Sequence, residues 1–285
     1  MFISGLRWRA TSALITAGAA AAAALALTVP AGAVTGTAEI SPEHAGYTAT
    51  GAQFKEIDAT VYLRNPAQYS GEVSHYSHSV QLWSSGLVAV VGVTASTSGA
   101  SYTPYATIYN RSTHQVIASS PNAVFCNDED RCSPTIGTFA AGDSVSLRLA
   151  YFPTAGDLFY FAEDNNTLDA FVSEPPYPVG TGVSFTQARV GTEFGGSPWD
   201  NSYSHTPPVR FTKAAAYTGV ALTTYNGHTS TLWSWWVHHK LLANTEQQSS
   251  ADWVAIPTDL TLSGGSFQTW FVPQSAQGPA QPVLP

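Results

Sequence analysis

Hydrophobic and polar residues alternate with a period of two along most of this chain, as in "EIDATVYL" and "SVSLRLAYF". This spacing is typical of β-strands with one buried face, and almost no helical periodicity is present. Gly, Pro, Asn and Asp separate the runs, and "YNGH" at 225–228 holds the Asn-Gly signal of a tight hairpin. The pattern predicts strands at 56–63, 79–85, 87–95, 105–110, 144–152, 158–164, 183–194, 209–217, 231–239 and 265–271.

These strands have no helices between them that could cover a parallel sheet. Short strands of this kind predict an all-β fold of two packed antiparallel sheets. We expect one sandwich domain over residues 35–272, followed by a flexible Pro- and Gln-rich tail at 273–285.

The first 34 residues are expected to be a signal peptide. Arg7 and Arg9 precede an alanine-rich apolar run, and "AGA" at 31–33 offers small residues for cleavage near Val34. A retained membrane anchor is the alternative. The signal reading predicts a secreted, extracellular protein with no membrane attachment after cleavage.

The remaining chain is acidic. Without Arg7 and Arg9 it has 9 basic residues against 19 acidic ones, a net charge of about −10. Nucleic acids and anionic membranes require clusters of Lys and Arg, so neither is an expected partner. We expect a monomer whose ligand is a polypeptide or a carbohydrate.

Cys126 and Cys132 are the only cysteines, and they enclose the acidic stretch "NDEDR". In an exported protein this short spacing predicts a disulfide that closes a surface loop. The acids at 128–130 could ligate calcium, but a solvated turn is favoured because the periodic oxygen ligands of a calcium loop are missing. His75 and His78 are expected to be surface histidines, and no metal site is predicted.

Several segments resemble the glutamic peptidases, also called the eqolisin or peptidase G1/A4 family. "AGYTATGAQFKEIDATVYLRNP" is similar to the family's opening hairpin and first long strand. "FAAGDSVSLRLAYFPTAGDLFYFAEDNNTLDAF" resembles its Gly-Asp turn and paired strands, and "ARVGTEF" its Ala-Glu-hydrophobic-Ile-Val-Glu segment. "PPVRFTKAAA" and "IPTDLTLSGGSFQTWF" resemble the strands that follow. The order is kept from Ala45 to Phe271, which implies a concanavalin-like β-sandwich, or jelly roll.

The resemblance places Glu193 at the family's catalytic glutamate, as a candidate general base. In the implied mechanism this carboxylate takes a proton from water as the water attacks a peptide carbonyl. A glutamine amide on a neighbouring strand polarises the carbonyl and stabilises the oxyanion. No cofactor is implied. From the residues alone, Glu193 could equally be a strand carboxylate paired with Arg189 or Arg210.

Other parts of the family pattern are missing. Its glutamine lies in an Ile-Leu-Gln-x-Gly strand, and the matching stretch "VAVVGV" has Val90 at the glutamine position. "IYN" at 108–110 replaces a Trp-Tyr-Glu strand, and Arg189 replaces the first acid of the glutamate segment. We therefore expect a weak or inactive peptidase homologue that binds peptide or glycan in the cleft. In the alternative, Gln81 or Asn110 supplies the amide and the chain is an active acid-pH endopeptidase.

Four further residues are candidates for ligand binding: Trp199, Asp200, Tyr109 and Arg189. Trp199 and Asp200 follow Glu193 in a loop that either packs over the core or lines the substrate site. Strand 231–239 would carry tryptophans on both faces, one buried and one an exposed platform for peptide or sugar. A glycoside hydrolase is a weaker alternative, because that chemistry needs a second carboxylate facing the first.

Overall fold

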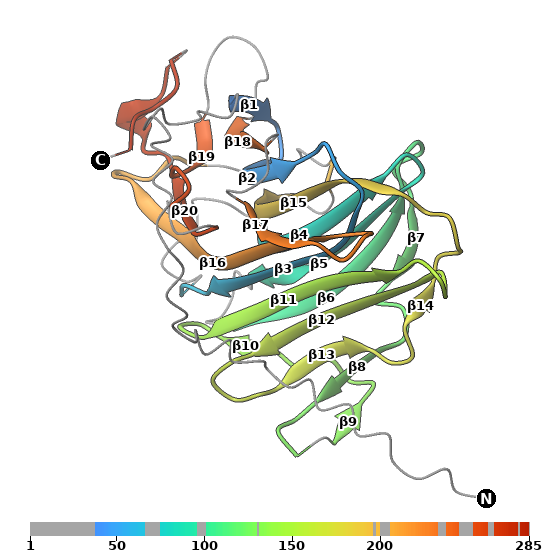
Figure 1. Ribbon diagram of the computed structural model, residues 1–285. Coiled ribbons are helices and arrows are strands. Elements are labelled where there is room, and N and C mark those ends of the chain that lie inside the picture. The colour runs from blue at the N-terminus through green and yellow to red at the C-terminus, as the bar shows by residue number, and fades with distance from the viewer. Residues whose placement is uncertain are drawn as a thin grey trace, which may run out of the picture. The chain divides into compact units, whose positions relative to one another are not determined.

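The structure is a computed structural model, and the residues that it describes all fall within Thr35–Pro285 (Figure 1). The described ranges are 38–65, 75–95, 101–129, 131–195, 198–199, 206–232, 238–244, 253–261, 265–278 and 280–284. Within these ranges, no helix has both the length and the apolar character needed to span a membrane.

The first sheet contains the strand that carries Glu193. Successive pairings give the order β1–β18–β2–β15–β4–β5–β6, antiparallel except for β1 with β18. The strands are β1 (Ala38–Ser41), β18 (His238–Asn244), β2 (His44–Ala49), β15 (Phe185–Phe194), β4 (Tyr76–Ser84), β5 (Leu87–Ala95) and β6 (Ser101–Asn110). Two short strands, β7 (Val116–Ser119) and β10 (Phe139–Ala140), also pair with β6.

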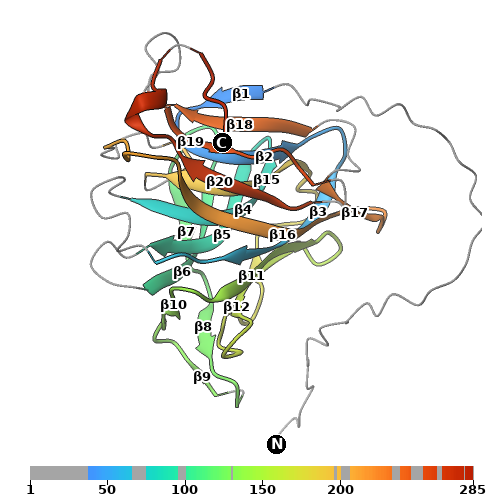
Figure 2. The same cartoon turned by 90° about the vertical axis from the view of Figure 1, so that its left-hand side faces the viewer.

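The second sheet is antiparallel throughout, in the order β19–β20–β16–β3–β11–β12–β13–β8–β9. Its strands are β19 (Trp253–Pro257), β20 (Phe267–Phe271), β16 (Thr212–Thr224), β3 (Phe54–Tyr62), β11 (Ser144–Phe152), β12 (Asp157–Asp164), β13 (Ala170–Ser173), β8 (Ala123–Cys126) and β9 (Cys132–Ser133). β14 (Tyr177–Pro178) pairs with β12, and β17 (Thr229–Thr231) pairs with β16. Figure 2 shows β1, β18 and β2 together at one end of the unit, and β8 and β9 at the other.

The core lies between the two sheets, and alternation decides which side chains enter it. On β4, Val80 and Leu82 are completely buried in the main hydrophobic cluster. Ser79, Gln81 and Trp83 occupy the intervening positions and therefore point to the other face. The two sheets are also joined at one side, because β19 pairs with both β18 and β20.

The all-β sandwich prediction is confirmed, and helical structure in the described residues is limited to short 3₁₀ turns such as Gln274–Ala276. The jelly-roll connectivity stays a prediction. One predicted strand, 231–239, is wrong as a continuous element, since β17 ends at Thr231 and Leu232 is already in a 3₁₀ conformation. The tryptophans of that segment lie outside the described residues.

Short strands account for most of what the sequence pattern missed. β2, β7, β8, β13 and β19 have six residues or fewer, so each offers too few alternations to detect. In the segment where the sequence predicts a flexible tail, Gln277 hydrogen-bonds to the backbone N and O of Trp253. The Trp253 indole donates to the carbonyls of Gly278 and Ala280, and these bonds link the segment to β19.

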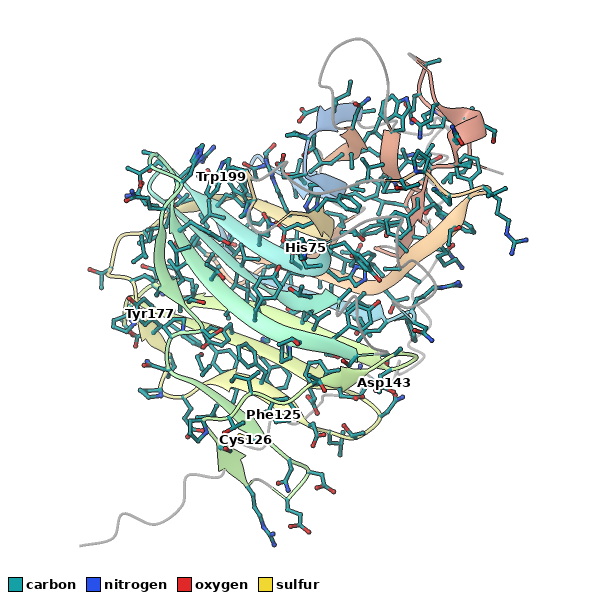
Figure 3. The ribbon with its side chains drawn as sticks, turned by 180° about the vertical axis from the view of Figure 1, so that it is seen from behind. His75, Phe125, Cys126, Asp143, Tyr177 and Trp199 are labelled. Atoms are coloured by element: carbon teal, nitrogen blue, oxygen red, sulfur yellow. A yellow bond between two sulfur atoms is a disulfide. The ribbon has the colours of Figure 1, made fainter. Side chains whose placement is uncertain are left out.

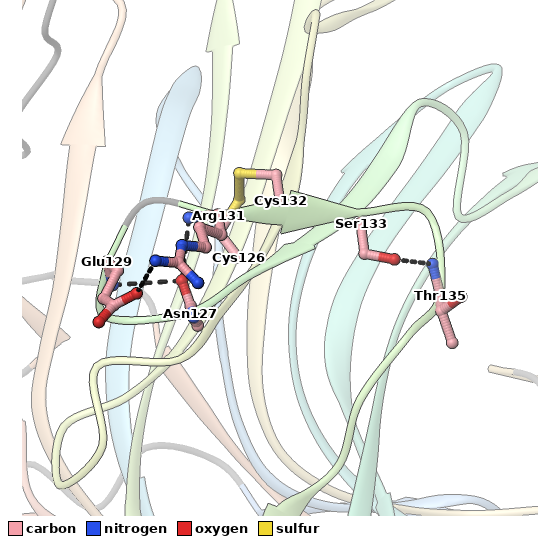
Figure 4. The surroundings of a disulfide bond; sticks show 7 residues. All are labelled: Cys126, Asn127, Glu129, Arg131, Cys132, Ser133 and Thr135. Carbon is pink, nitrogen blue, oxygen red and sulfur yellow. Dashed lines mark hydrogen bonds and ion pairs between the residues drawn. A yellow bond between two sulfur atoms is a disulfide. The ribbon is translucent and has the colours of Figure 1, made fainter.

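The predicted disulfide between Cys126 and Cys132 is confirmed (Figure 4). It joins paired residues of β8 and β9 at the end of the second sheet. Inside the loop, Asn127 accepts hydrogen bonds from the backbone of Glu129 and Arg131, which also form an ion pair of 2.8 Å. Asp130 lies outside the described residues.

The prediction of a surface position is wrong for His78. Its side chain is completely buried, and Nδ1 lies 3.1 Å from the Thr192 hydroxyl and 3.0 Å from the Tyr217 hydroxyl. Thr192 also bonds Thr269 of β20. This polar cluster joins the two sheets directly behind Glu193, and burial lowers the pKa of His78 to about 3, so the ring is neutral.

A group of charges lies on the outer face of the second sheet. Asp58 of β3 is opposite Arg148 of β11, with 3.4 Å between Oδ1 and Nε, and Arg148 also pairs with Glu56. Burial and the charge of Glu56 raise the pKa of Asp58 from 3.8 to about 7, although Arg148 opposes the shift.

We predict that Asp58→Asn stabilises the fold increasingly as the pH rises from about 4 to 7, and by a constant amount above pH 7. In this window the folded protein binds a proton at Asp58 that the unfolded chain has released. The contribution of Asp58 to the free energy of unfolding therefore falls as the pH rises, and asparagine makes no such contribution. Urea unfolding of both proteins at several pH values gives the difference directly. Buried His44 and His78 make the free energy of unfolding rise with pH over part of the same range. Both proteins share that effect, so the quantity to compare is the difference between Asp58→Asn and the parent.

The control is Asp128→Asn, which removes the same charge at an exposed turn position. A difference between Asp58→Asn and the parent that does not depend on pH would contradict the prediction.

Candidate active site

Strand β15 presents Glu193 on the face turned away from the core. Its neighbours in sequence, Thr192 and Phe194, are both buried on the core side. Glu193 is paired in register with Ser77 of β4 and with His44 of β2. Side chains of directly opposed residues share a face, so β4 supplies the nearest partners of the carboxyl group.

Gln81 and Ser79 of β4 both donate hydrogen bonds to Glu193. The Gln81 amide Nε2 donates to Oε1, and the Ser79 hydroxyl lies 2.9 Å from Oε2. Nε2 of Gln81 is also 3.3 Å from the Ser79 hydroxyl oxygen. Of the two candidate amides, Gln81 is therefore the one that contacts Glu193, and Val90 at the expected glutamine position does not leave the carboxyl group without an amide partner.

Tyr105 of β6 is the third donor. Its hydroxyl is 3.1 Å from Glu193 Oε2 and 3.0 Å from the Ser77 hydroxyl. Tyr105 is opposite Gly92 of β5, where an added Cβ would lie 2.4 Å from the His78 carbonyl oxygen. Glycine at this position leaves the space between Tyr105 and Ser79 open, so the phenol reaches across β5 to the carboxylate.

Burial raises the pKa of Glu193 above its ordinary value of 4.5. Hydrogen bonds from Ser79 and Tyr105, the positive charge of Arg189 and the Gln81 amide act in the opposite direction. A buried carboxylate surrounded by donors can be ionised in weakly acidic solution and still accept a proton, which is the property required of a general base.

A cavity of about 140 Å³ adjoins the carboxyl group. Its lining combines hydroxyl and aromatic side chains from β4, β5 and β6 with the segment after β15: His75, Ser77, Val90, Thr94, Tyr105, Thr107, Tyr109, Glu193, Gly195 and Pro198. Figure 3 labels His75 and Trp199, which both lie along the first sheet.

Three side chains lie in a row beside Gln81 and Glu193: Trp83, Arg189 and Glu43. The Trp83 indole Nε1 donates to Gln81 Oε1 at 2.6 Å, and the Arg189 guanidinium lies 4.1 Å from the centre of the Trp83 ring. Arg189 is also 3.8 Å from Glu43, an ion pair too long for a hydrogen bond. Burial raises the pKa of Glu43 to about 7, against the charge of Arg189.

A pair of glycines brings β2 and β15 close together beside Glu193. A Cβ at Gly46 would lie 2.1 Å from the Val190 carbonyl oxygen, and one at Gly191 would lie 2.3 Å from that of Ala45. The His44 imidazole lies over both positions and is buried, and burial lowers its pKa to about 3.

Asn110 and Val90, the other residues considered for the amide position, do not hydrogen-bond to Glu193 through an amide. Asn110 is five residues beyond Tyr105 on β6, about 16 Å along an extended strand. Its side-chain oxygen accepts from the backbone of Ser112 and Thr113, so it closes the following turn. Val90 pairs in register with Gln81 and lines the cavity as an apolar wall.

The two aromatic residues proposed for ligand binding, Tyr109 and Trp199, lie near Gln81 and Glu193. Tyr109 lines the cavity and packs with Trp83, Val88 and Val90. Trp199 contacts the rings of Trp83 and Tyr109 edge to face and stacks on His114 with 4.2 Å between ring centres. Asp200 lies outside the described residues.

Sequence reasoning missed Ser79, Tyr105 and Trp83. For two of them a signal was present, because Ser79, Gln81 and Trp83 have the same parity in the predicted strand 79–85 and must share a face. Polar residues that alternate with Val80 and Leu82 indicate a functional outer face. Tyr105 had no such signal, since two strands separate it from β15.

The fold is that of the eqolisin glutamic peptidases. One similar solved structure is scytalido-glutamic peptidase with a peptide-based transition-state analogue, with a TM-score of 0.53, 14% identity, and coverage of 81% of this chain and 98% of that one. Another is SCP-B, a member of the eqolisin family, in complex with the tripeptide Ala-Ile-His, with a TM-score of 0.52, 15% identity and the same coverage. No protein-family model matches the chain, and no curated protein matches it.

We predict that Ser79→Ala raises the pKa of Glu193 further, because the ionised carboxylate loses a hydrogen-bond donor. Carbon-13 NMR of the glutamate carboxyl groups across the acid range measures the shift. Ser173→Ala is the control: this buried hydroxyl accepts from the Tyr160 backbone on the other sheet. An unchanged titration of Glu193 in Ser79→Ala would contradict the prediction.

Proposed function

We propose that this chain is an active glutamic-type endopeptidase that hydrolyses polypeptides in acidic solution. The observation that carries the proposal is the hydrogen bond between the Gln81 amide and the Glu193 carboxyl group, beside a cavity. The expectation of a weak or inactive binding protein rested on Val90 at the glutamine position and on the changes at 108–110 and at Arg189, and the hydrogen bond of Gln81 removes the first of these grounds. Two solved structures with the same fold are peptidases by name and hold peptide ligands, which supports the same substrate class.

In the proposed mechanism, Glu193 accepts a proton from a water molecule in the cavity as its oxygen attacks the peptide carbonyl carbon. The Gln81 amide donates to the carbonyl oxygen and stabilises the negative charge that develops there. One amide hydrogen is directed at Glu193, and the other makes only a 3.3 Å contact with Ser79, so it is the one available to the substrate.

Collapse of the tetrahedral intermediate breaks the carbon–nitrogen bond, and the proton held by Glu193 passes to the leaving nitrogen. The products are a free carboxyl group and a free amine. Because one carboxyl group acts first as base and then as acid, its pKa should lie near the working pH. A pKa above 4.5 favours weakly acidic conditions.

The side chains that hydrogen-bond to Glu193 in the described structure are two hydroxyls and an amide, the kind of donors that favour an ionised carboxylate. We also propose that the protein is exported, on the support of its charged and apolar N-terminal segment and its disulfide.

We predict that the purified chain cleaves a denatured protein between pH 2 and 6, that Glu193→Gln abolishes cleavage, and that Gln81→Asn lowers kcat. Loss of one oxyanion donor typically lowers kcat about a hundred- to a thousandfold. Mass spectrometry of the peptides in H₂¹⁸O measures cleavage and the origin of the new carboxyl oxygen.

The matched controls are Glu163→Gln on β12 and Gln268→Asn on β20, which make the same chemical changes on the second sheet. Absence of cleavage, combined with peptide binding that weakens in Glu193→Ala, would refute the peptidase and favour the binding protein.

A further inference from the structure

The Gln81 side chain can be useful to the proposed chemistry in only one of its two orientations. Its amide nitrogen must face Glu193 and the substrate, while its oxygen faces away. The two orientations have nearly the same shape, so packing alone does not choose between them. The choice depends on the groups that the two ends of the amide meet: Glu193 at the nitrogen and Trp83 at the oxygen.

The Gln81 oxygen meets the Trp83 indole N–H at 2.6 Å. An indole nitrogen only donates, so only the oxygen of the amide can be its partner. With the amide reversed, its NH₂ would face the indole N–H and its oxygen would face the carboxyl oxygens of Glu193. Both contacts would be repulsive when Glu193 is ionised, in a place where Gln81 is completely buried and Trp83 is 3% exposed.

The Trp83 ring is itself held in place by its neighbours. Arg189, directly opposite Gln81 in the β4–β15 pairing, lies over the ring at 4.1 Å. Val88, Val90 and Tyr109 pack around the indole, and Trp199 contacts it edge to face. A rigid indole keeps its N–H aimed at one point.

We propose that Trp83 is a positioning residue that fixes the orientation of the Gln81 amide, and that Arg189 supports it by holding the indole ring. This inference rests on the proposed function, since the amide is useful only if Gln81 and Glu193 act together. It assigns Arg189, at the position of a family acid, a role in the geometry of the site.

The test is Trp83→Phe, which keeps an aromatic ring and removes the N–H. We expect kcat to fall about tenfold or more with little change in KM, because the amide is retained but no longer held in one orientation. The pKa of Glu193, followed by carbon-13 NMR, should rise, because a reversed amide presents its oxygen to the carboxylate. Arg189→Lys keeps the charge, loses the planar stack and should show both effects more weakly.

Trp253→Phe is the matched control. Trp253 is also 3% exposed, and its indole N–H also donates hydrogen bonds, here to the carbonyls of Gly278 and Ala280 beside β19. Its replacement should alter stability to a similar degree and leave both kcat and the Glu193 titration unchanged.

An unchanged kcat and Glu193 pKa in Trp83→Phe would overturn the inference, as would equal changes in Trp253→Phe. If the parent protein cleaves no substrate, the proposed peptidase function fails. The inference about Trp83 is then still decided by the Glu193 pKa, which should rise in Trp83→Phe and not in Trp253→Phe.

Discussion

The buried carboxyl group of Glu193 is the constraint on which the arrangement around it depends. Only 4% of its surface is exposed, and an ionised carboxylate without donors would be strongly unfavourable there. The site supplies Ser79, Gln81 and Tyr105, so both carboxyl oxygens have a donor. These donors make ionisation possible, while burial raises the pKa of the carboxyl group above its ordinary value.

The sandwich provides this environment because each strand of the first sheet has two different faces. On β4, Val80 and Leu82 enter the core, and Ser79, Gln81 and Trp83 alternate with them on the opposite face, which carries the site. Behind the site, the cluster of His78, Thr192, Tyr217 and Thr269 connects the two sheets through hydrogen bonds. These contacts fix the height and tilt of β15, so a displacement of Glu193 by about 1 Å would require both sheets to shift.

Trp83 extends this network away from the carboxyl group. The sequence of contacts runs from Arg189 over the indole, through the indole N–H to the Gln81 oxygen, and from the Gln81 nitrogen to Glu193. The indole N–H can only donate and an ionised carboxylate can only accept, so the Gln81 amide between them has one favourable orientation.

The sequence alone determined the all-β sandwich and the disulfide, because alternation, turn residues and cysteine spacing are local properties. Glu193 became the candidate base only through the resemblance to the glutamic peptidases. The sequence left open whether the amide is absent, with Val90 in its place, or is supplied by one of two candidates, Gln81 or Asn110. Gln81 and Val90 lie directly opposite each other on adjacent strands, so strand patterns alone could not decide which one faces Glu193. That choice depends on the pairing of β15 with β4, more than a hundred residues apart in sequence, and on the register of that pair, and a shift of one residue would turn Gln81 into the core. Only the tertiary structure fixes that register, through the buried side chains on the opposite face.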